Sequence, residues 1–193
     1  AIDFAATLGL ADDVLSGTES VPDDVSSKTI PSTLVVVKPI RGCASDDVFL
    51  CGTFNEVRSA CETILGSTKF GSPKEKHDTV LVQEFAVGQE FAIDTVSKGG
   101  EMKIAAVWIY DKRPTNSAPF VYYATRLYDG EHCHVLHDYL HQCLDALGIM
   151  YGITHSEVIM TESGPRLVEV NCRQHNMDFL PLTMNGIGYN IYL

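Results

Sequence analysis

The sequence has little positive charge and no long apolar run. Lys and Arg total 14 against 25 Asp and Glu, so the net charge is −11 over 193 residues. Because nucleic-acid backbones are bound by basic surfaces, we expect no nucleic-acid partner. A small phosphate ligand needs only a few local cations and is not excluded. No stretch approaches the roughly 18 apolar residues of a membrane span, and the first residues lack the pattern of a signal peptide.

Cysteine pairs with metal-binding spacing are also missing. The six cysteines include no CxxC pair: Cys43, Cys51, Cys61, Cys133, Cys143 and Cys172. Scattered cysteines in a chain of this size indicate free thiols in a reducing compartment, the cytoplasm or an organelle stroma, and not a disulfide framework. The chain also lacks an initiator Met, so we expect a fragment or a processed form.

Hydrophobic periodicity predicts alternating strands and helices after a loop-rich start. Residues 3–10 resemble the end of a helix closed at Gly9, and residues 11–33 a loop. Strands are expected over 33–39, 48–51 and 79–85, a hairpin over 89–113, and a strand or irregular crossing over 120–128. Helices are expected over 53–67, capped by Thr53, and over 134–149, and the charged segment 67–78 is expected to be a mobile loop. This order predicts the α+β class, with helices packed on mostly antiparallel sheets.

A final hairpin, expected over 152–171 with its turn at 162–164, carries acidic residues inside apolar strands. Glu169 and Asn171 share a face by the period of two, and the turn sets Glu157 opposite Glu169. Two carboxylates and an amide oxygen suit Mg²⁺, and Arg173 could clamp an anion beside it. A half-exposed hairpin with a surface Glu–Arg pair explains this segment equally well.

Two upstream segments are weaker candidates for nucleotide contacts. In "VVVKPIRGCASDDV", Lys38 ends an apolar strand and Ser45 lies in a loop of small residues whose backbone N–H groups could bind phosphate. In "VLVQEFAVGQEFAID", Gln83 and Glu84 end a strand that could border a base, and Glu90 could accept bonds from a ribose. An exposed lysine in a turn and an ordinary hairpin are the simpler explanations of each segment alone.

The histidine-rich segment 132–143 raises a different possibility. His137 and His141 are four residues apart on the expected helix and could bind Zn²⁺ from one face. No CxxC or HExxH pattern accompanies them. The apolar stripe of Leu136, Leu140, Leu144 and Leu147 indicates that packing of this helix explains the segment without a metal.

Taken together, the motifs resemble the ATP-grasp superfamily, and more closely its carboxylate–amine ligase branch, which includes bacterial L-amino-acid ligases. The resemblance covers about residues 31–180 and is most specific at E-x-N-x-R, twelve residues after the first acid. It implies an ATP-grasp fold of two lobes, mostly antiparallel sheet with packed helices, with ATP between them. The expected division is a linker or remnant at 1–30, a small lobe at 31–86 and a large lobe at 87–193, the last truncated.

The resemblance also implies roles for individual residues. By this resemblance, Lys38 and Ser45 contact the phosphates of ATP, and Glu90 contacts the ribose. The adenine hinge consists of Gln83, Glu84, Phe85 and Ala86. The ligands of Mg²⁺, or of Mn²⁺ as a second choice, are Glu157, Glu169 and Asn171. Arg173 and Lys112, with Arg113, are the catalytic candidates, and 67–78 is a candidate lid.

The implied reaction joins a carboxylate to an amine or thiol through an acylphosphate, with small-molecule substrates. Three departures from the family pattern support an alternative, a non-catalytic ATP-grasp-like module in a homo-oligomer or larger assembly. Lys28 lies too close to Lys38 to be the second phosphate lysine of the family. We expect the N-terminal domain of the family to be missing from this chain. Asp47 occupies a position where the phosphate loop often has glycine, and its carboxylate would repel phosphates at close range.

Overall fold

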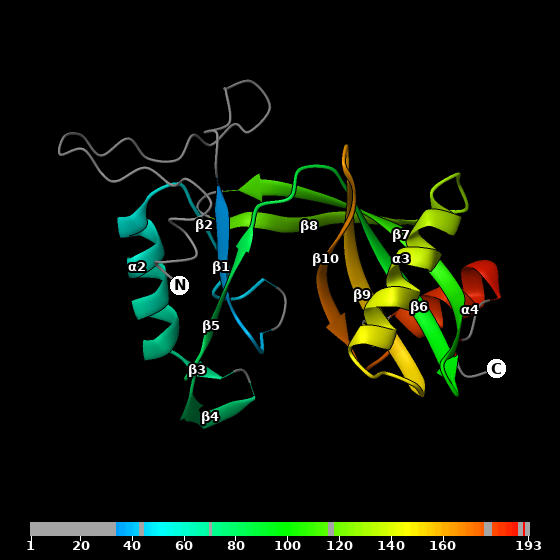
Figure 1. Cartoon of the computed structure of the whole chain (residues 1–193), viewed down its shortest axis with the longest axis horizontal. Helices are drawn as coiled ribbons and strands as arrows, with labels where there is room; N and C mark the ends of the chain where they lie inside the picture. Colours follow the sequence, from blue (N-terminus) through cyan, green and yellow to red (C-terminus); the bar gives the residue numbers. More distant parts are fainter. Residues whose placement is uncertain are drawn as a thin grey trace. The chain divides into compact units, whose positions relative to one another are not determined.

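The computed structural model describes residues 34–42, 45–69, 71–115, 118–175, 179–188 and 191. The chain divides into two compact units, residues 1–85 with 112–121 and residues 86–111 with 122–193. Antiparallel sheets with packed helices dominate both, which confirms the α+β class (Figure 1). The helix end at Gly9 and the loop at 11–33 lie outside the described residues, and the predicted lobe boundary at residue 86 stays a prediction.

The first unit contains a three-stranded antiparallel sheet covered by one helix. Its strands are β1 (Val35–Pro39), β2 (Phe49–Cys51) and β5 (Val80–Glu84), in the order β2-β1-β5. Helix α2 (Phe54–Gly66) packs on this sheet. The core is apolar and fully or nearly buried: Val35, Val37, Cys51, Val57, Ala60 and Ile64.

Helix α2 begins at the predicted cap. The Thr53 Oγ1 accepts a hydrogen bond from the Glu56 backbone N–H at 3.3 Å. In return, the Glu56 Oε2 accepts from the backbone N–H groups of Thr53 and Gly52 at 3.0 and 2.7 Å. This capping box satisfies N–H groups that the first turn of a helix leaves unpaired, so the helix start is encoded locally.

The prediction that 67–78 forms a loop without regular secondary structure is wrong. Two short strands, β3 (Thr68–Lys69) and β4 (Ser72–Lys76), pair antiparallel there. The His77 side chain is buried, and its backbone N–H donates to the Ser67 carbonyl at 3.3 Å. A hairpin with charged, exposed side chains shows no hydrophobic periodicity, because its pairing depends on backbone hydrogen bonds. It therefore cannot be predicted from the hydrophobicity pattern.

The second unit contains most of a five-stranded antiparallel sheet in the order β10-β9-β6-β7-β8, of which the parts of β7 and β8 within 112–121 belong to the first unit. The strands are β6 (Gln89–Lys98), β7 (Glu101–Thr115), β8 (Ala118–Leu127), β9 (Gly152–Thr161) and β10 (Gly164–Asn171). The segment left open between strand and irregular crossing is therefore strand β8. Helix α3 (Cys133–Ala146) packs on one face with Phe91, Ile93, Val107 and Val158.

The other face of this sheet carries a smaller aromatic cluster. Helix α4 (Phe179–Ile187) brings Phe179 against Trp108, with ring centroids 5.0 Å apart. This helix was not predicted, because it contains Pro181 and Gly186 and has weak intrinsic helix propensity. Among the described residues, no helix is both long and apolar enough to cross a membrane.

The predicted core stripe of α3 is correct except at its end. Leu136, Leu140 and Leu144 are buried, whereas Leu147 is 57% exposed. The helix ends at Ala146, so Leu147 leaves the buried face.

Candidate functional site

The β9–β10 hairpin places two carboxylates directly across from each other. Glu157 and Glu169 are Cα partners, as the sequence predicts, and the turn lies at 162–163 before Gly164, whose φ is 107°. The register shifts between Leu167 and Glu169. This β-bulge was not predicted. Without the extra residue, Val168 would face Glu157, so the bulge creates the carboxylate pair.

The two carboxylates have different surroundings. Glu157 is 6% exposed, whereas Glu169 is exposed and accepts a 2.7 Å hydrogen bond from the Asn171 side-chain nitrogen. Like charges directly opposite on neighbouring strands repel each other, and a divalent cation between them removes that repulsion. The donors are carboxylate and amide oxygens, the set that Mg²⁺ prefers. The residues present therefore fit a magnesium ion.

A tyrosine that the sequence did not single out joins this group. The Tyr122 hydroxyl on β8 donates to Glu157 Oε1 at 3.2 Å. Burial, together with the negative charges of Glu157, Glu90 and Glu169, raises the pKa of Tyr122. Glu90, Glu157 and Glu169, which the sequence marked separately, thus act on one hydroxyl. Nothing in "FVYYATRLY" separates Tyr122 from its neighbours, since strand β8 itself was uncertain.

The two predicted catalytic cations lie in different units. Arg173 follows β10, is exposed, and donates to the Gln174 carbonyl at 2.9 Å. Lys112 is half-buried and belongs to the first unit. Their catalytic roles stay predictions.

The predicted phosphate loop contains two residues with left-handed backbone. Lys38 is half-buried on β1, opposite Leu81 of β5. Ser45 and Asp47 have φ values of 60° and 55°, a region that favours glycine. The Asp47 carboxylate, expected to repel phosphate, accepts a 2.7 Å hydrogen bond from Ser67 at the end of α2. This hydrogen bond connects the predicted phosphate loop to the end of α2, and one oxygen of the Asp47 carboxylate accepts it.

Strand β5 carries the predicted adenine hinge at one edge of its sheet. The Phe85 N–H donates to the Leu34 carbonyl at 3.0 Å, so Phe85 faces β1. In an antiparallel ladder the intervening residue, Glu84, directs its backbone groups to the opposite edge. That edge pairs with no strand among the described residues, and its contact with a base stays a prediction. Gln83 is half-buried, opposite Val36.

The remaining hinge and ribose candidates belong to the second unit. Ala86 is half-buried, and the half-buried Glu90 pairs with Ile159 of β9. Beside them is a surface hollow of about 550 Å³ lined by Val87, Gly88 and residues 160–163. None of the predicted site residues lines this hollow, so it adds no support to their roles.

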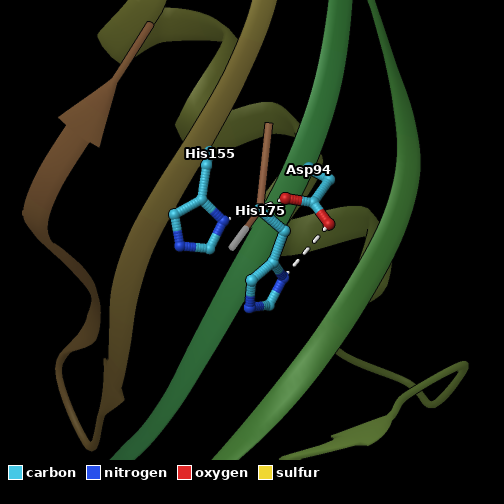
Figure 2. A group of neighbouring side chains, drawn as sticks. All are labelled: Asp94, His155 and His175. Atoms are coloured by element: carbon cyan, nitrogen blue, oxygen red, sulfur yellow. Dashed lines mark hydrogen bonds and ion pairs between the residues drawn. The ribbon is translucent and has the colours of Figure 1, made fainter. Parts of the chain in front are cut away.

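A second polar cluster, buried under α4, was not predicted as a unit. Asp94, His155 and His175 bring ligand-type atoms within 4.8 Å of one another. Figure 2 shows both imidazole rings directed toward the Asp94 carboxylate. His155 Nδ1 lies 2.9 Å from Asp94 Oδ1, and His175 Nδ1 lies 3.4 Å from Oδ2. The Trp108 indole N–H also donates to Oδ2, at 2.8 Å.

The contacts of this cluster set its charges. Burial alone would raise the pKa of Asp94, but the hydrogen bond from His155 and the nearby His175 imidazole together outweigh burial and lower that pKa to about 2. Burial lowers the pKa of His155, and the hydrogen bond to Asp94 outweighs it, so the net shift is upward. Asp94 is therefore an ionised, buried acceptor that holds an imidazole N–H.

The surface histidines on α3 do not form such a group within the described residues. His137 Nδ1 contacts Asp138 at 3.0 Å, and His141 Nε2 contacts the Gly100 carbonyl at 3.1 Å. Helix packing and local hydrogen bonds account for both side chains.

Comparison with known proteins identifies the relatives of this chain. A family model described as "ATP-grasp domain" matches residues 31–177. Dapdiamide A synthase of Enterobacter agglomerans is 34% identical over 148 residues, which are 72% of this chain and 32% of that protein.

Two solved structures share the fold. An L-amino acid ligase from Bacillus licheniformis has a TM-score of 0.54 at 20% identity, over 89% of this chain and 39% of that one. The biotin carboxylase domain of the Hydrogenobacter thermophilus 2-oxoglutarate carboxylase, solved with MgADP and bicarbonate, has a TM-score of 0.58 at 14% identity, over 81% and 34%. The chain thus spans about a third of the length of these relatives.

Proposed function

Because the chain belongs to the ATP-grasp domain family, we propose that it is the nucleotide-binding part of an ATP- and Mg²⁺-dependent carboxylate–amine ligase. The observation that carries this proposal is the carboxylate pair of Glu157 and Glu169, opposed across β9 and β10 with Asn171 beside it. The relatives named as a synthase and a ligase support the reaction class, and the MgADP of a fold neighbour supports the cofactor.

The binding roles follow the chemistry of each group. Glu157, Glu169 and Asn171 would hold Mg²⁺ through oxygen atoms, and the bound ion would supply positive charge against the ATP phosphates. Lys38 and the backbone around Ser45 bind phosphate oxygens. The open edge of β5 at Glu84, within the segment 83–86, hydrogen-bonds the adenine.

The remaining roles concern the ribose and the reacting groups. Glu90 accepts from the ribose hydroxyls, and Arg173 and Lys112 stabilise negative charge on the transferring group. Positioning and electrostatics supply most of the rate in such phosphoryl transfers.

The proposed reaction has two balanced steps. A substrate carboxylate oxygen attacks the γ-phosphorus, the bond to ADP breaks, and an acylphosphate forms. The substrate amine then attacks the acyl carbon, phosphate leaves with the bonding electrons, and an amide forms after the amine loses a proton. A short hairpin, β3–β4, is the candidate lid that keeps water from the acylphosphate.

Calorimetric titration of the chain with Mg·ATP tests the nucleotide role. We expect saturable binding and a higher unfolding temperature in its presence, because a ligand of the native state stabilises it. Glu169→Ala should weaken binding at least about 10-fold, or ~1.4 kcal/mol. Glu101→Ala, which removes an exposed carboxylate at the start of β7, should leave it unchanged.

Two results would contradict the proposal. Equal weakening by both variants would mean that general charge, and not the metal pair, controls binding. No heat and no stabilisation with excess Mg·ATP would favour a non-catalytic ATP-grasp-like module. If the chain binds Mg·ATP, release of phosphate on adding an amino-acid mixture tests the ligase reaction.

A further inference from the structure

Glu157 is attached to a buried polar network that the proposed nucleotide contacts leave unexplained. A buried carboxylate binds a metal tightly only when its side chain is held in one orientation. Both contacts described for Glu157 are made by the same oxygen. The Tyr122 hydroxyl donates to Oε1 at 3.2 Å, and His155 Nε2 lies 3.9 Å from it.

His155 is itself fixed from both ends. Its Nδ1 lies 2.9 Å from Asp94 Oδ1, and its Nε2 lies 3.3 Å from the Tyr110 hydroxyl. An ionised carboxylate can only accept, so Nδ1 carries the hydrogen, and the ring plane is set by Asp94. Trp108 anchors Asp94 in turn, through the 2.8 Å bond to Oδ2. The network thus runs from the sheet interior to the metal pair.

Strand register keeps these groups on one face. Asp94 of β6 pairs with His155 of β9, and Ala92 pairs with Glu157. Residues two apart on a strand share a face, so Asp94 and Ala92 lie beside His155 and Glu157. Ala92 is fully buried and small, which leaves room for the longer Glu157 side chain next to it.

We propose that Tyr122, His155 and Asp94 are positioning residues that hold the Glu157 carboxylate in the orientation that binds the divalent cation. The proposal rests on the metal role of Glu157 within the proposed function. Tyr122 of β8 donates to Oε1, the ring of His155 on β9 lies 3.9 Å from the same oxygen, and Asp94 fixes that ring. None of the three is a metal ligand in this arrangement.

The alternative is that Asp94, His155 and His175 themselves bind a transition metal. Their donor set suits Zn²⁺ better than Mg²⁺. However, each Asp94 oxygen already accepts a hydrogen bond, from His155 and from Trp108. Hydrogen bonding therefore accounts for the carboxylate without a metal, and zinc binding is an outcome that the experiment must be able to detect.

Binding of Mn²⁺ to the full chain, followed by the loss of the free-ion EPR signal without nucleotide, tests the proposal. Tyr122→Phe removes one hydroxyl and keeps the aromatic ring, so the fold should survive. His155→Asn keeps a donor near Asp94 but lacks Nε2, whereas His155→Gln keeps a donor near Glu157. The control is Tyr151→Phe, at a tyrosine that is 72% exposed before β9.

Tyr122→Phe and His155→Asn should each weaken Mn²⁺ binding about 10-fold, the usual effect of removing an outer-shell partner. His155→Gln should recover part of that loss, and Tyr151→Phe should bind like the wild type. A residue with a merely structural role would lower the unfolding temperature and leave the Mn²⁺ affinity of the folded fraction unchanged. Unchanged affinity in Tyr122→Phe and His155→Asn would therefore overturn the proposal.

Three further outcomes are decisive. Wild-type chain that binds no Mn²⁺ overturns the positioning role, because there is then no metal site to position. Mn²⁺ binding with the expected variant losses, but without calorimetric binding of Mg·ATP, supports the positioning role and rejects only the nucleotide role. One equivalent of zinc in the purified chain that His175→Ala removes overturns the network in favour of a metal centre.

Discussion

Replacing Asp94 with Asn should remove a pH-dependent part of the folding stability. Asp94 is 1% exposed and accepts hydrogen bonds from His155 and Trp108. The hydrogen bond from His155 and the nearby His175 imidazole together outweigh the effect of burial and lower its pKa to about 2. An aspartate in an unfolded chain titrates near pH 3.9, so the folded state binds its proton about two pH units later.

The size and sign of the effect follow from that difference. A lowered folded-state pKa stabilises the protein above the unfolded pKa, and this stability is lost as pH falls from about 4 toward 2. About two units correspond to roughly 2–3 kcal/mol. The pKa of His155 is shifted upward, away from this window, so Asp94 is the member of this hydrogen-bonded pair that responds. The Asn variant also leaves a buried donor unpaired, a cost of about 1–3 kcal/mol that does not depend on pH.

The assay is urea unfolding between pH 2 and 6, followed by tryptophan fluorescence. The chain has one tryptophan, Trp108, which contacts Asp94 directly and so reports on this part of the sheet. The stability difference between the wild type and Asp94→Asn should be largest above pH 5 and shrink by about 2–3 kcal/mol toward pH 2. Asp145→Asn, at an exposed carboxylate on α3, corrects for the general effect of charge. A difference that stays constant with pH would refute the assignment of a lowered pKa to Asp94.

Two other predictions concern backbone packing and thiol reactivity. Gly88→Ala should destabilise the second unit by about 1–3 kcal/mol or more, because its Cβ would lie 1.9 Å from the backbone oxygen of Met160. Gly66→Ala, where a Cβ meets nothing within 4 Å, is the control, and equal melting temperatures would contradict this reasoning. Cys51 should resist alkylation at pH 8 while the exposed Cys172 reacts, since burial and a nearby glutamate raise the pKa of Cys51 to about 12. Peptide mapping by mass spectrometry measures the alkylation rates of Cys51 and Cys172. Equal rates at the two thiols would contradict the prediction for Cys51.

Local signals predicted the elements whose causes lie close together in the chain. The capping box at Thr53 and Glu56 starts α2 within four residues. Strand periodicity and the turn before Gly164 predicted the hairpin that carries Glu157 and Glu169, and put Asn171 on the same face as Glu169. The E-x-N-x-R pattern of that hairpin also carried the resemblance to the ATP-grasp family, which the match over residues 31–177 establishes.

The errors came from features with no local hydrophobic signature. The β3–β4 hairpin was expected to be a loop because its side chains are charged and exposed. Helix α4 was missed because its residues have weak intrinsic helix propensity. Its visible support is a tertiary contact, the packing of Phe179 on Trp108. The bulge at Val168 changes which residue faces Glu157, and a pattern of strict alternation cannot include it.

The sequence by itself determined the motifs, the α+β class and the hairpin that carries the two carboxylates, because capping, turns and strand alternation act over a few residues. Only the tertiary structure decided what surrounds Glu157. Asp94 and His155 are 61 positions apart in the chain, and Tyr122 and Glu157 are 35 apart. Strand order and register bring these residues to one face of the sheet. Their hydrogen bonds exist only once the sheet has formed, since no local pattern links strands so distant in the chain.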